Sequence, residues 1–256
     1  MSNVKTLNEQ VVIITGAGRG LGASIAKSFA REGAKVAINY RNSKEQAELL
    51  ADELGNNAIA VQGDVRDRES IAQMLQTVIE KLGEPTTLVH NALADYRFNG
   101  DLRDTIESLT EERLLQQHKT AVVGALNMIQ AVVPYMEKSH FGRIITIGTN
   151  LFQNPVVPYH DYTSAKGALL ALTRTATKDL GSKSISVNMV SGGLLKTTDA
   201  SSGTPDEVFD FIAQSTPLGS VTTPDELADT VLFFASPWAR AVTGQNLIVD
   251  GGLVFG

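Results

Sequence analysis

Short apolar runs rich in β-branched residues alternate with stretches of helical periodicity along the chain, which has 256 residues. Near-continuous apolar strands separated by helices are typical of a parallel sheet that helices cover on both faces. The sequence therefore predicts an α/β fold. Strands are predicted at residues 11–14, 36–38, 59–62, 87–90, 143–147, 185–189 and 246–250. Helices are predicted from the turn at 16–22 to residue 31 and over residues 43–54, 69–82, 110–136, 162–180 and 224–234.

Composition excludes several classes of protein. No apolar run approaches the roughly 18 to 20 residues that a membrane-spanning helix needs, and residues 1–10 lack the apolar stretch of a secretory signal. The chain has no cysteine, which excludes disulfides, thiolate nucleophiles and cysteine zinc sites and is compatible with the cytoplasmic location that we expect. The net charge is −6 and no basic run occurs, so no nucleic-acid surface is expected.

The pattern gives no sign of a boundary within the chain. We find no internal repeat, linker or shift in composition, so residues 1–256 are predicted to form a single domain. The four histidines show no metal-ligand pattern, and no metal site is expected.

A glycine-rich segment, Thr15-Gly16-Ala17-Gly18-Arg19-Gly20-Leu21-Gly22, links the first predicted strand to the first predicted helix. Such a turn lets the backbone approach a phosphate closely, and the helix N-terminus adds free N–H groups and the positive end of the helix dipole. Its glycine spacing is longer than the standard dinucleotide fingerprint. The alternative, an ordinary turn whose glycines pack the helix, is disfavoured by the position within a βαβ unit.

The end of the second predicted strand bears on the choice of nucleotide. NAD-type sites carry an acidic residue about 20 residues beyond the glycine turn, where it holds the ribose 2′-hydroxyl. Residues 39–43 contain no carboxylate. Arg41 is well placed for a 2′-phosphate and Arg19 for a second clamp, because guanidinium groups suit phosphate oxygens. The sequence therefore predicts NADP(H); the alternative is that both arginines are solvated surface charges.

Tyr162 and Lys166 are four residues apart in a predicted helix. Residues with this spacing share one face, so Lys166 brings a positive charge near the phenol. A nearby positive charge favours phenolate and is expected to lower the Tyr162 pKa from its usual value near 10. A tyrosine of this kind can exchange a proton with a carbonyl or hydroxyl oxygen. Together with a nucleotide site, the pair suggests hydride transfer to or from a carbonyl.

These motifs resemble those of the short-chain dehydrogenase/reductase family, and most of all its bacterial 3-oxoacyl-acyl-carrier-protein reductase branch. The resemblance runs from residue 11 to residue 252 and includes Gly63-Asp64-Val65 and residues 242–245 and 250–252. It implies a doubly wound Rossmann-type fold with a seven-stranded parallel sheet and helices on both faces. It also implies a nicotinamide cofactor and assembly as a homotetramer or homodimer.

The same resemblance assigns roles to single residues. It makes Tyr162 the acid/base, Lys166 the group that tunes its pKa and anchors the cofactor ribose, and Thr149 the donor to the carbonyl oxygen. The expected substrate is a small-molecule or acyl-carrier carbonyl that is interconverted with an alcohol. The residues expected to bind the cofactor are Gly16, Arg19, Gly20, Leu21, Gly22, Tyr40, Arg41, Asp64, Val65, Asn91, Ala92, Tyr162, Lys166 and Gly193.

The chain departs from the family pattern within the active-site motifs. The family's Asn-Asn-Ala-Gly after the fourth strand reads His90-Asn91-Ala92-Leu93 here. Its Pro-Gly after the sixth strand reads Gly192-Gly193, and its catalytic serine, which lies thirteen residues before Tyr162, falls at Thr149. Threonine keeps the hydroxyl and adds a methyl group.

The family's catalytic asparagine falls at Ala121. His118, one helical turn earlier, is a candidate stand-in, and a histidine on the helix surface is the alternative. Because Leu93 and Ala121 depart from the pattern, two rival functions stay open. One is a catalytically weakened NADP-binding sensor, and the other is a structural subunit of a hetero-oligomer.

The substrate is expected outside the carboxyl ends of the strands. Candidate segments are residues 96–98, 150–160 and 193–217. The loop 95–108 is longer than we expect for the family, which suggests a reshaped pocket. Residues 193–217 are predicted to form a substrate lid with a small amphipathic helix at 204–212; packing of that helix onto the body is the alternative.

Overall fold

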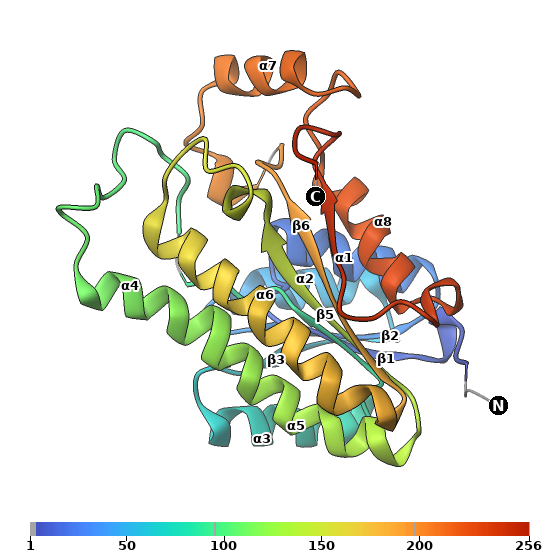
Figure 1. The fold of residues 1–256 in the computed structure, drawn as a ribbon. Helices are drawn as coiled ribbons and strands as arrows, with labels where there is room; N and C mark the ends of the chain where they lie inside the picture. The colour runs from blue at the N-terminus through green and yellow to red at the C-terminus, as the bar shows by residue number, and fades with distance from the viewer. Residues whose placement is uncertain (1–3, 95, 197, 256) are drawn as a thin grey trace.

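The computed structural model describes residues 4–94, 96–196 and 198–255. Within these ranges, seven strands form a sheet in the order β3-β2-β1-β4-β5-β6-β7, and every neighbouring pair is parallel (Figure 1). This confirms the predicted fold. The strands are β1 (Val11–Ile14), β2 (Lys35–Tyr40), β3 (Ala58–Gln62), β4 (Thr87–His90), β5 (Gly142–Thr149), β6 (Ile185–Gly192) and β7 (Asn246–Val249).

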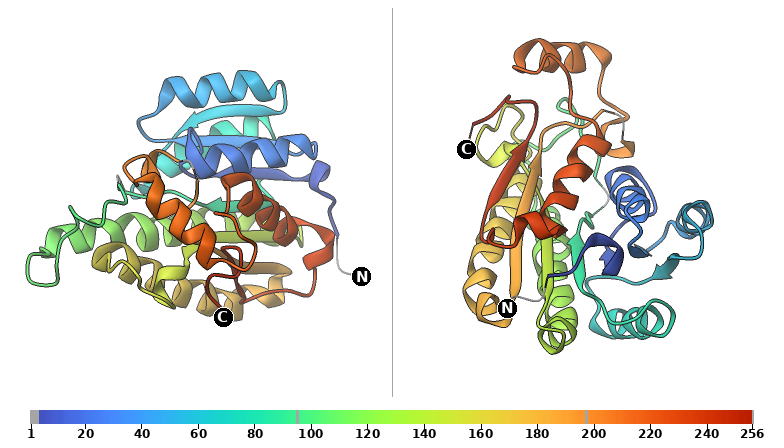
Figure 2. Two further views of the ribbon diagram at one scale, coloured as in Figure 1. Left: turned by 90° about the horizontal axis from the view of Figure 1, so that it is seen from above. Right: turned by 90° about the vertical axis from the view of Figure 1, so that its right-hand side faces the viewer.

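Helices cover both faces of the sheet, as the two views in Figure 2 show. Successive residues of a strand point to opposite faces. Val12 and Ile14 of β1 accordingly pack with residues of α1, α2 and α8, whereas Val11 and Ile13 pack with residues of α3 and α5. The helices are α1 (Gly20–Arg31), α2 (Lys44–Leu54), α3 (Arg68–Lys81), α4 (Glu111–His118), α5 (Gly124–Lys138), α6 (His160–Leu180), α7 (Asp206–Ser215) and α8 (Pro224–Ala235).

The strand order changes direction beside β1. The chain passes outward from β1 to β2 and β3, and β4 then returns to pair with the other side of β1. The helical connections that follow β1 and β4 therefore run to opposite sides of β1, and this change of direction predicts a ligand crevice at the carboxyl edge of the sheet. Ligands of open parallel sheets bind at such a crevice.

Several predicted elements differ from the observed ones at their ends. The helix predicted at 110–136 is divided into α4 and α5 by a π-helical turn, Lys119–Val123. The strand predicted at 185–189 extends to Gly192 as β6, because its last residues pair with Thr149 and Val249 of the neighbouring strands. The helix predicted in the lid is observed as α7, which lies at the top of Figure 1 above the carboxyl edge of the sheet.

Asp95 and Thr197, which fall in the predicted loop 95–108 and the predicted lid 193–217, lie outside the described residues. Across the three ranges that the structure covers, none of the helices combines the length and the apolar character needed to cross a bilayer. The assignment of residues 1–256 to a single domain stays a prediction.

Candidate active site

The glycine turn after β1 has a backbone that requires glycine. Gly16 and Gly20 have φ values of +64° and +55°, in the left-handed region that favours glycine. A Cβ added to Gly22 would lie 2.5 Å from the carbonyl oxygen of Gly16, and one added to Gly16 would lie 3.1 Å from Cα of Ala92. Leu21 lies in the first turn of α1. The turn therefore brings bare backbone and a helix N-terminus to the crevice, which fits the pyrophosphate of a dinucleotide.

Thr15 and Asn91 tie the glycine turn to the end of β4. The Thr15 hydroxyl oxygen accepts hydrogen bonds from the backbone N–H groups of Asn91 and Ala92, both at 3.0 Å. The Asn91 amide donates to the carbonyl oxygens of Thr15 and Gly16, at 3.1 and 3.0 Å. Asn91 and Ala92 are thereby held at the crevice, where the cofactor ribose is expected.

The predicted adenosine side lies at the ends of β2 and β3. Arg41 is exposed one residue beyond β2, whereas Tyr40 is buried in the core against α1 and α2. The Asp64 carboxylate is bound by the guanidinium and the backbone N–H of Arg66. These bonds, chiefly those from the Arg66 side chain, lower the Asp64 pKa to about 2, and the charge of Arg41 acts in the same direction. Val65 is buried against Gly124.

Arg19 already has an ionic partner. Its guanidinium lies 3.1 Å from the carboxylate of Asp199, and both side chains are largely exposed. Asp199 begins a 3₁₀ turn, Asp199–Ser201, whose Ala200 carbonyl accepts a hydrogen bond from the backbone N–H of Phe98 at 2.9 Å. The start of the predicted lid thus joins the glycine turn to the loop after β4.

The three predicted catalytic residues come together at the carboxyl end of β5. Thr149 is the last residue of β5, and its side chain lies close enough to Tyr162 on α6 to favour the ionised form of that phenol. Lys166 donates to the carbonyl oxygen of Ile147 at 2.6 Å, and its Nζ lies 5.7 Å from the centre of the Tyr162 ring. Tyr162 is 7% exposed and Lys166 3% exposed. The arrangement places two hydroxyls side by side, with a buried ammonium behind them.

Burial, more than the lysine charge, sets the protonation of this group. It raises the Tyr162 pKa to about 12, opposed by the hydrogen bond from Thr149, and it lowers the Lys166 pKa to about 8. The prediction that Lys166 lowers the Tyr162 pKa below its ordinary value is therefore wrong here, because desolvation of the phenolate outweighs the opposing effects. Tyr162 holds its proton at neutral pH, as a proton donor to a carbonyl must.

An aromatic cluster covers Tyr162. Tyr96 stacks on its ring, Phe98 meets the ring edge to face at 5.2 Å, and Tyr159 contacts both Tyr96 and Phe98. The sequence singled out residues 96–98 and the segment 150–160, which contains Tyr159, for the substrate region, but it gave no role to Asp161. The Asp161 carboxylate accepts from the Tyr96 hydroxyl at 3.1 Å and from the backbone N–H of Tyr162 at 2.8 Å. The signal in the sequence that could have identified Asp161 was its position next to Tyr162.

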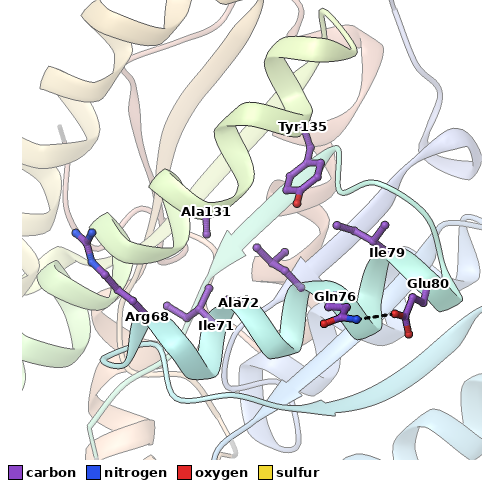
Figure 3. Close-up of a pocket in the computed structure, with 9 residues that line it drawn as sticks. Arg68, Ile71, Ala72, Gln76, Ile79, Glu80, Ala131 and Tyr135 are labelled. Atoms are coloured by element: carbon purple, nitrogen blue, oxygen red, sulfur yellow. Dashed lines mark hydrogen bonds between the residues drawn. The ribbon is translucent and has the colours of Figure 1, made fainter.

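Two pockets lie on very different parts of the surface. A pocket of about 320 Å³ borders the aromatic cluster and is lined by Tyr96, Tyr159 and Asp161, among others. A larger pocket of about 490 Å³ lies between α3 and α5, where Arg68 and Tyr135 stand at its two ends (Figure 3). Of the described residues, none that we assign to the active site lines the larger pocket. The smaller one is therefore the candidate for substrate.

His90 is a buried residue that sequence reasoning did not assign to the site. It ends β4, is 1% exposed, and its Nε2 lies 3.1 Å from the carbonyl oxygen of Ala121. His118, the candidate stand-in for the family asparagine, instead bonds to the Leu114 carbonyl of its own helix at 3.0 Å. The sequence did contain a signal for His90. In His90-Asn91-Ala92-Leu93, a histidine replaces the first asparagine of the family's Asn-Asn-Ala-Gly.

The segment after β6 passes close to the end of the chain. A Cβ on Gly193 would lie 3.1 Å from the Asn150 amide nitrogen, so the backbone here is tightly packed. That amide donates to the Asp250 carboxylate at 2.9 Å. Asp250 also accepts from the backbone N–H groups of residues 252, 253 and 254. In the part of the chain that the structure covers, no group of three or more His, Asp or Glu residues is placed to hold a metal ion.

A glycine turn after β1 and a buried tyrosine–lysine pair beside the end of β5 are together typical of an α/β oxidoreductase. A family model described as enoyl-(acyl carrier protein) reductase matches residues 16–254. The chain belongs to the short-chain dehydrogenase/reductase family, and this membership implies a nicotinamide cofactor.

Relatives and a solved structure match over nearly full length. The chain is 33% identical to a 3-oxoacyl-acyl-carrier-protein reductase of Synechocystis sp., over 97% of this chain and 98% of the relative. It is 32% identical to the enzyme of that name from Staphylococcus aureus, over 94% and 96%. The crystal structure of a dehydrogenase/reductase from Sinorhizobium meliloti is similar with a TM-score of 0.85 and 31% identity, and the match covers 98% of this chain and 97% of that one.

Proposed function

We propose that the protein is an NADP(H)-dependent reductase that interconverts a carbonyl and an alcohol, similar to 3-oxoacyl-acyl-carrier-protein reductases. The observation that carries this proposal is the buried set of Thr149, Tyr162 and Lys166 at the crevice beside the glycine turn. A proton donor, a second hydroxyl donor and a fixed positive charge are what carbonyl reduction requires of a protein.

The crevice offers a place for each part of the cofactor, which supplies a hydride when bound. Gly16, Gly20, Leu21 and Gly22 would hold the pyrophosphate, and Asn91, Ala92, Tyr162, Lys166 and Gly193 would surround the nicotinamide riboside. Asp64 and Val65 would contact the adenine, with Arg41 and Arg19 at the 2′-phosphate. For Tyr40 the backbone is the available group, because its side chain packs in the core.

The residues of the chain then handle the proton and the carbonyl oxygen. Tyr162 donates its proton to the oxygen as negative charge develops there. The Thr149 hydroxyl donates a second hydrogen bond to the same oxygen, which lowers the energy of the transition state. Lys166, held by the Ile147 carbonyl, stabilises the phenolate that Tyr162 becomes. The raised Tyr162 pKa keeps the proton in place until the oxygen takes it.

The substrate in this proposal is a small-molecule or acyl-carrier carbonyl that enters beside Tyr96 and Tyr159. The names of the Synechocystis and Staphylococcus relatives support an acyl-carrier substrate. The segment 193–217 would act as its lid; its first turn already contacts Phe98 and Arg19. We further propose that the protein is located in the cytoplasm.

Assembly as a homotetramer or homodimer is part of the same proposal. Leu115, Val123 and Leu126 are exposed apolar side chains on α4, the π-helical turn and α5, where a second copy would cover them. Sedimentation of the purified protein tests this point. A monomer at micromolar concentration would contradict it.

NADPH oxidation across a panel of ketones and 3-oxoacyl thioesters tests the activity. We expect turnover by the native protein and a loss of about 10²–10⁴-fold in Tyr162→Phe, since a positioned proton donor contributes that much. NADPH binding by the variant should persist. Tight NADPH binding without turnover in the native protein would favour the sensor, and activity appearing only with a partner protein would favour the structural subunit.

A further inference from the structure

His90 lies behind the active site with both ring nitrogens occupied. Nε2 lies 3.1 Å from the Ala121 carbonyl oxygen, and Nδ1 lies 3.4 Å from the Thr15 hydroxyl. A carbonyl oxygen only accepts, so the Nε2 atom carries the hydrogen and Nδ1 accepts from Thr15. The Thr15 oxygen already accepts from Asn91 and Ala92, which leaves its own hydrogen for His90. The His90 tautomer with its hydrogen on Nε2 therefore satisfies both hydrogen bonds.

The His90 ring is neutral near pH 7. Complete burial lowers the His90 pKa to about 3, and the positive charge of Lys166 acts in the same direction. His90 therefore neither titrates near neutral pH nor adds a second positive charge beside Lys166. Its contribution is a fixed N–H donor.

That donor is directed at the irregular part of a helix. Ala121 lies in the π-helical turn between α4 and α5, and turns of this type occur frequently at functional sites. The turn packs against α6, the helix that carries Tyr162 and Lys166. On the other side, His90 is paired in register with Thr146, the neighbour of the Ile147 whose carbonyl receives Lys166. His90 thus lies between the two elements that surround Lys166.

We propose that His90 is a positioning residue: its Nε2–H holds the Ala121 carbonyl and thereby fixes the π-helical turn against α6, which keeps Lys166 on the Ile147 carbonyl behind Tyr162. The part of this inference that concerns turnover rests on the proposed function. The part that concerns the turn does not, because it can be measured in the free protein.

Three substitutions at His90 separate its two hydrogen bonds. The amide nitrogen of Gln is as many bonds from Cβ as Nε2 of histidine, so His90→Gln can still donate to Ala121. The amide of Asn corresponds to Nδ1, so His90→Asn can bond to Thr15 and leaves the Ala121 carbonyl unpaired. His90→Leu removes both bonds with little change in volume. His118→Leu is the control, since the hydrogen bond that His118 makes among the described residues goes to the Leu114 carbonyl of its own helix and not to the Ala121 carbonyl.

Amide hydrogen exchange over residues 119–125 and steady-state kinetics are the two measurements. We expect faster exchange in His90→Asn and His90→Leu, and a fall in kcat of about 10- to 100-fold with little change in the KM for NADPH, because small misplacements of catalytic groups are costly. His90→Gln should restore native exchange and most of kcat. His118→Leu should leave kcat unchanged.

Native exchange and native kcat in His90→Leu would overturn the inference, and so would a Gln variant no better than Leu. Faster exchange with native kcat would also overturn it, because the turn would then be free to move without consequence for Lys166. If the native protein oxidises NADPH with none of the carbonyls, the proposed function has failed. The exchange data would in that case still support or reject the role of His90 in holding the turn.

Discussion

The ring of Tyr96 stacks on the ring of Tyr162, with the ring centres 5.3 Å apart and the planes inclined by 26°. The same tyrosine donates its hydroxyl hydrogen to Asp161, which also accepts from the backbone N–H of Tyr162. The loop after β4 is thereby attached twice to the residue that we propose as the proton donor. One face of the Tyr162 ring is therefore covered by Tyr96.

The two attachments of Tyr96 can be tested separately. Tyr96→Phe keeps the stacked ring and loses the bond to Asp161, whereas Tyr96→Ala loses both. Because an aromatic pair contributes about 0.5–1.5 kcal/mol beyond its buried area, we expect kcat/KM to fall by roughly 10-fold in the Ala variant and by much less in Phe. Carbonyl reduction assays measure this. Equal losses in the two variants would show that the hydroxyl, not the ring, matters.

Thr149 is expected to be a working replacement for serine. Thr149→Ser keeps the hydroxyl and should retain activity within about threefold. Thr149→Val keeps the shape and removes the donor, and loss of one such donor typically costs about 10²–10³-fold in kcat. The two kcat values, measured with saturating NADPH, decide the matter. A Val variant with full activity would show that the hydroxyl is idle.

Arg41 should determine the preference between the two nicotinamide nucleotides. Arg41→Ala removes a charged donor to the 2′-phosphate, and hydrogen bonds to charged groups contribute about 1.5–3 kcal/mol. We therefore expect NADPH binding to weaken by roughly 10- to 100-fold and NADH binding to change little. Fluorescence titration of both nucleotides provides the comparison. Tighter NADH than NADPH binding by the native protein would refute the assignment.

If Arg19 holds the 2′-phosphate as we propose, Asp199 competes with the cofactor for it. Its ion pair with Arg19 joins two exposed side chains, and such pairs contribute about 0–1 kcal/mol. Asp199→Asn should free the guanidinium and tighten NADPH binding by up to about fivefold. Asp206→Asn, an exposed change at the start of α7, is the matched control. Unchanged binding in Asp199→Asn would remove Arg19 from the phosphate site.

The Asp64–Arg66 pair should make stability depend on acid pH. The folded pKa of Asp64 is about 2, below its ordinary value of 3.8, so the pair stabilises the fold above pH 4 and this contribution is lost as the pH falls toward 2. The pair is partly exposed and screened by solvent, so we expect a loss of roughly 1 kcal/mol. Urea unfolding of native protein and Asp64→Asn between pH 5 and pH 2 measures it. Identical pH profiles would contradict the expectation.

Much of the fold could be predicted because its signals are local. The strands β1 and β4 have the predicted bounds, since each is a short apolar run that ends at a polar or glycine-rich segment. The turn at Lys119–Val123 could not be predicted in the same way. A π-helical turn inserts one residue into a helix and leaves the composition unchanged, and the hydrophobic pattern of residues 110–136 continues through it.

The parts of the candidate site that depend on the spacing of residues within one helix could be predicted. The parts that depend on packing between distant segments could not. The Tyr162–Lys166 pair follows from helical periodicity alone. The direction of the Tyr162 pKa shift depends on how completely the ring is buried, which involves Tyr96 and Phe98 from a loop far away in sequence. His90 and Ala121 likewise lie in two elements that are far apart along the chain, and nothing in the sequence predicts that they are in contact.

Asp250 has a practical consequence for anyone who handles this protein. Its carboxylate fixes the last described residues of the chain and holds Asn150, the neighbour of Thr149, from the far side. A protease cut or an affinity tag in the segment after β7 would therefore disturb the end of β5. Tags are better attached ahead of residue 4, because residues 4–10 lie away from the carboxyl edge of the sheet (Figure 1). An assay on a C-terminally tagged sample would then measure a protein in which the contact between Asp250 and Asn150 is altered.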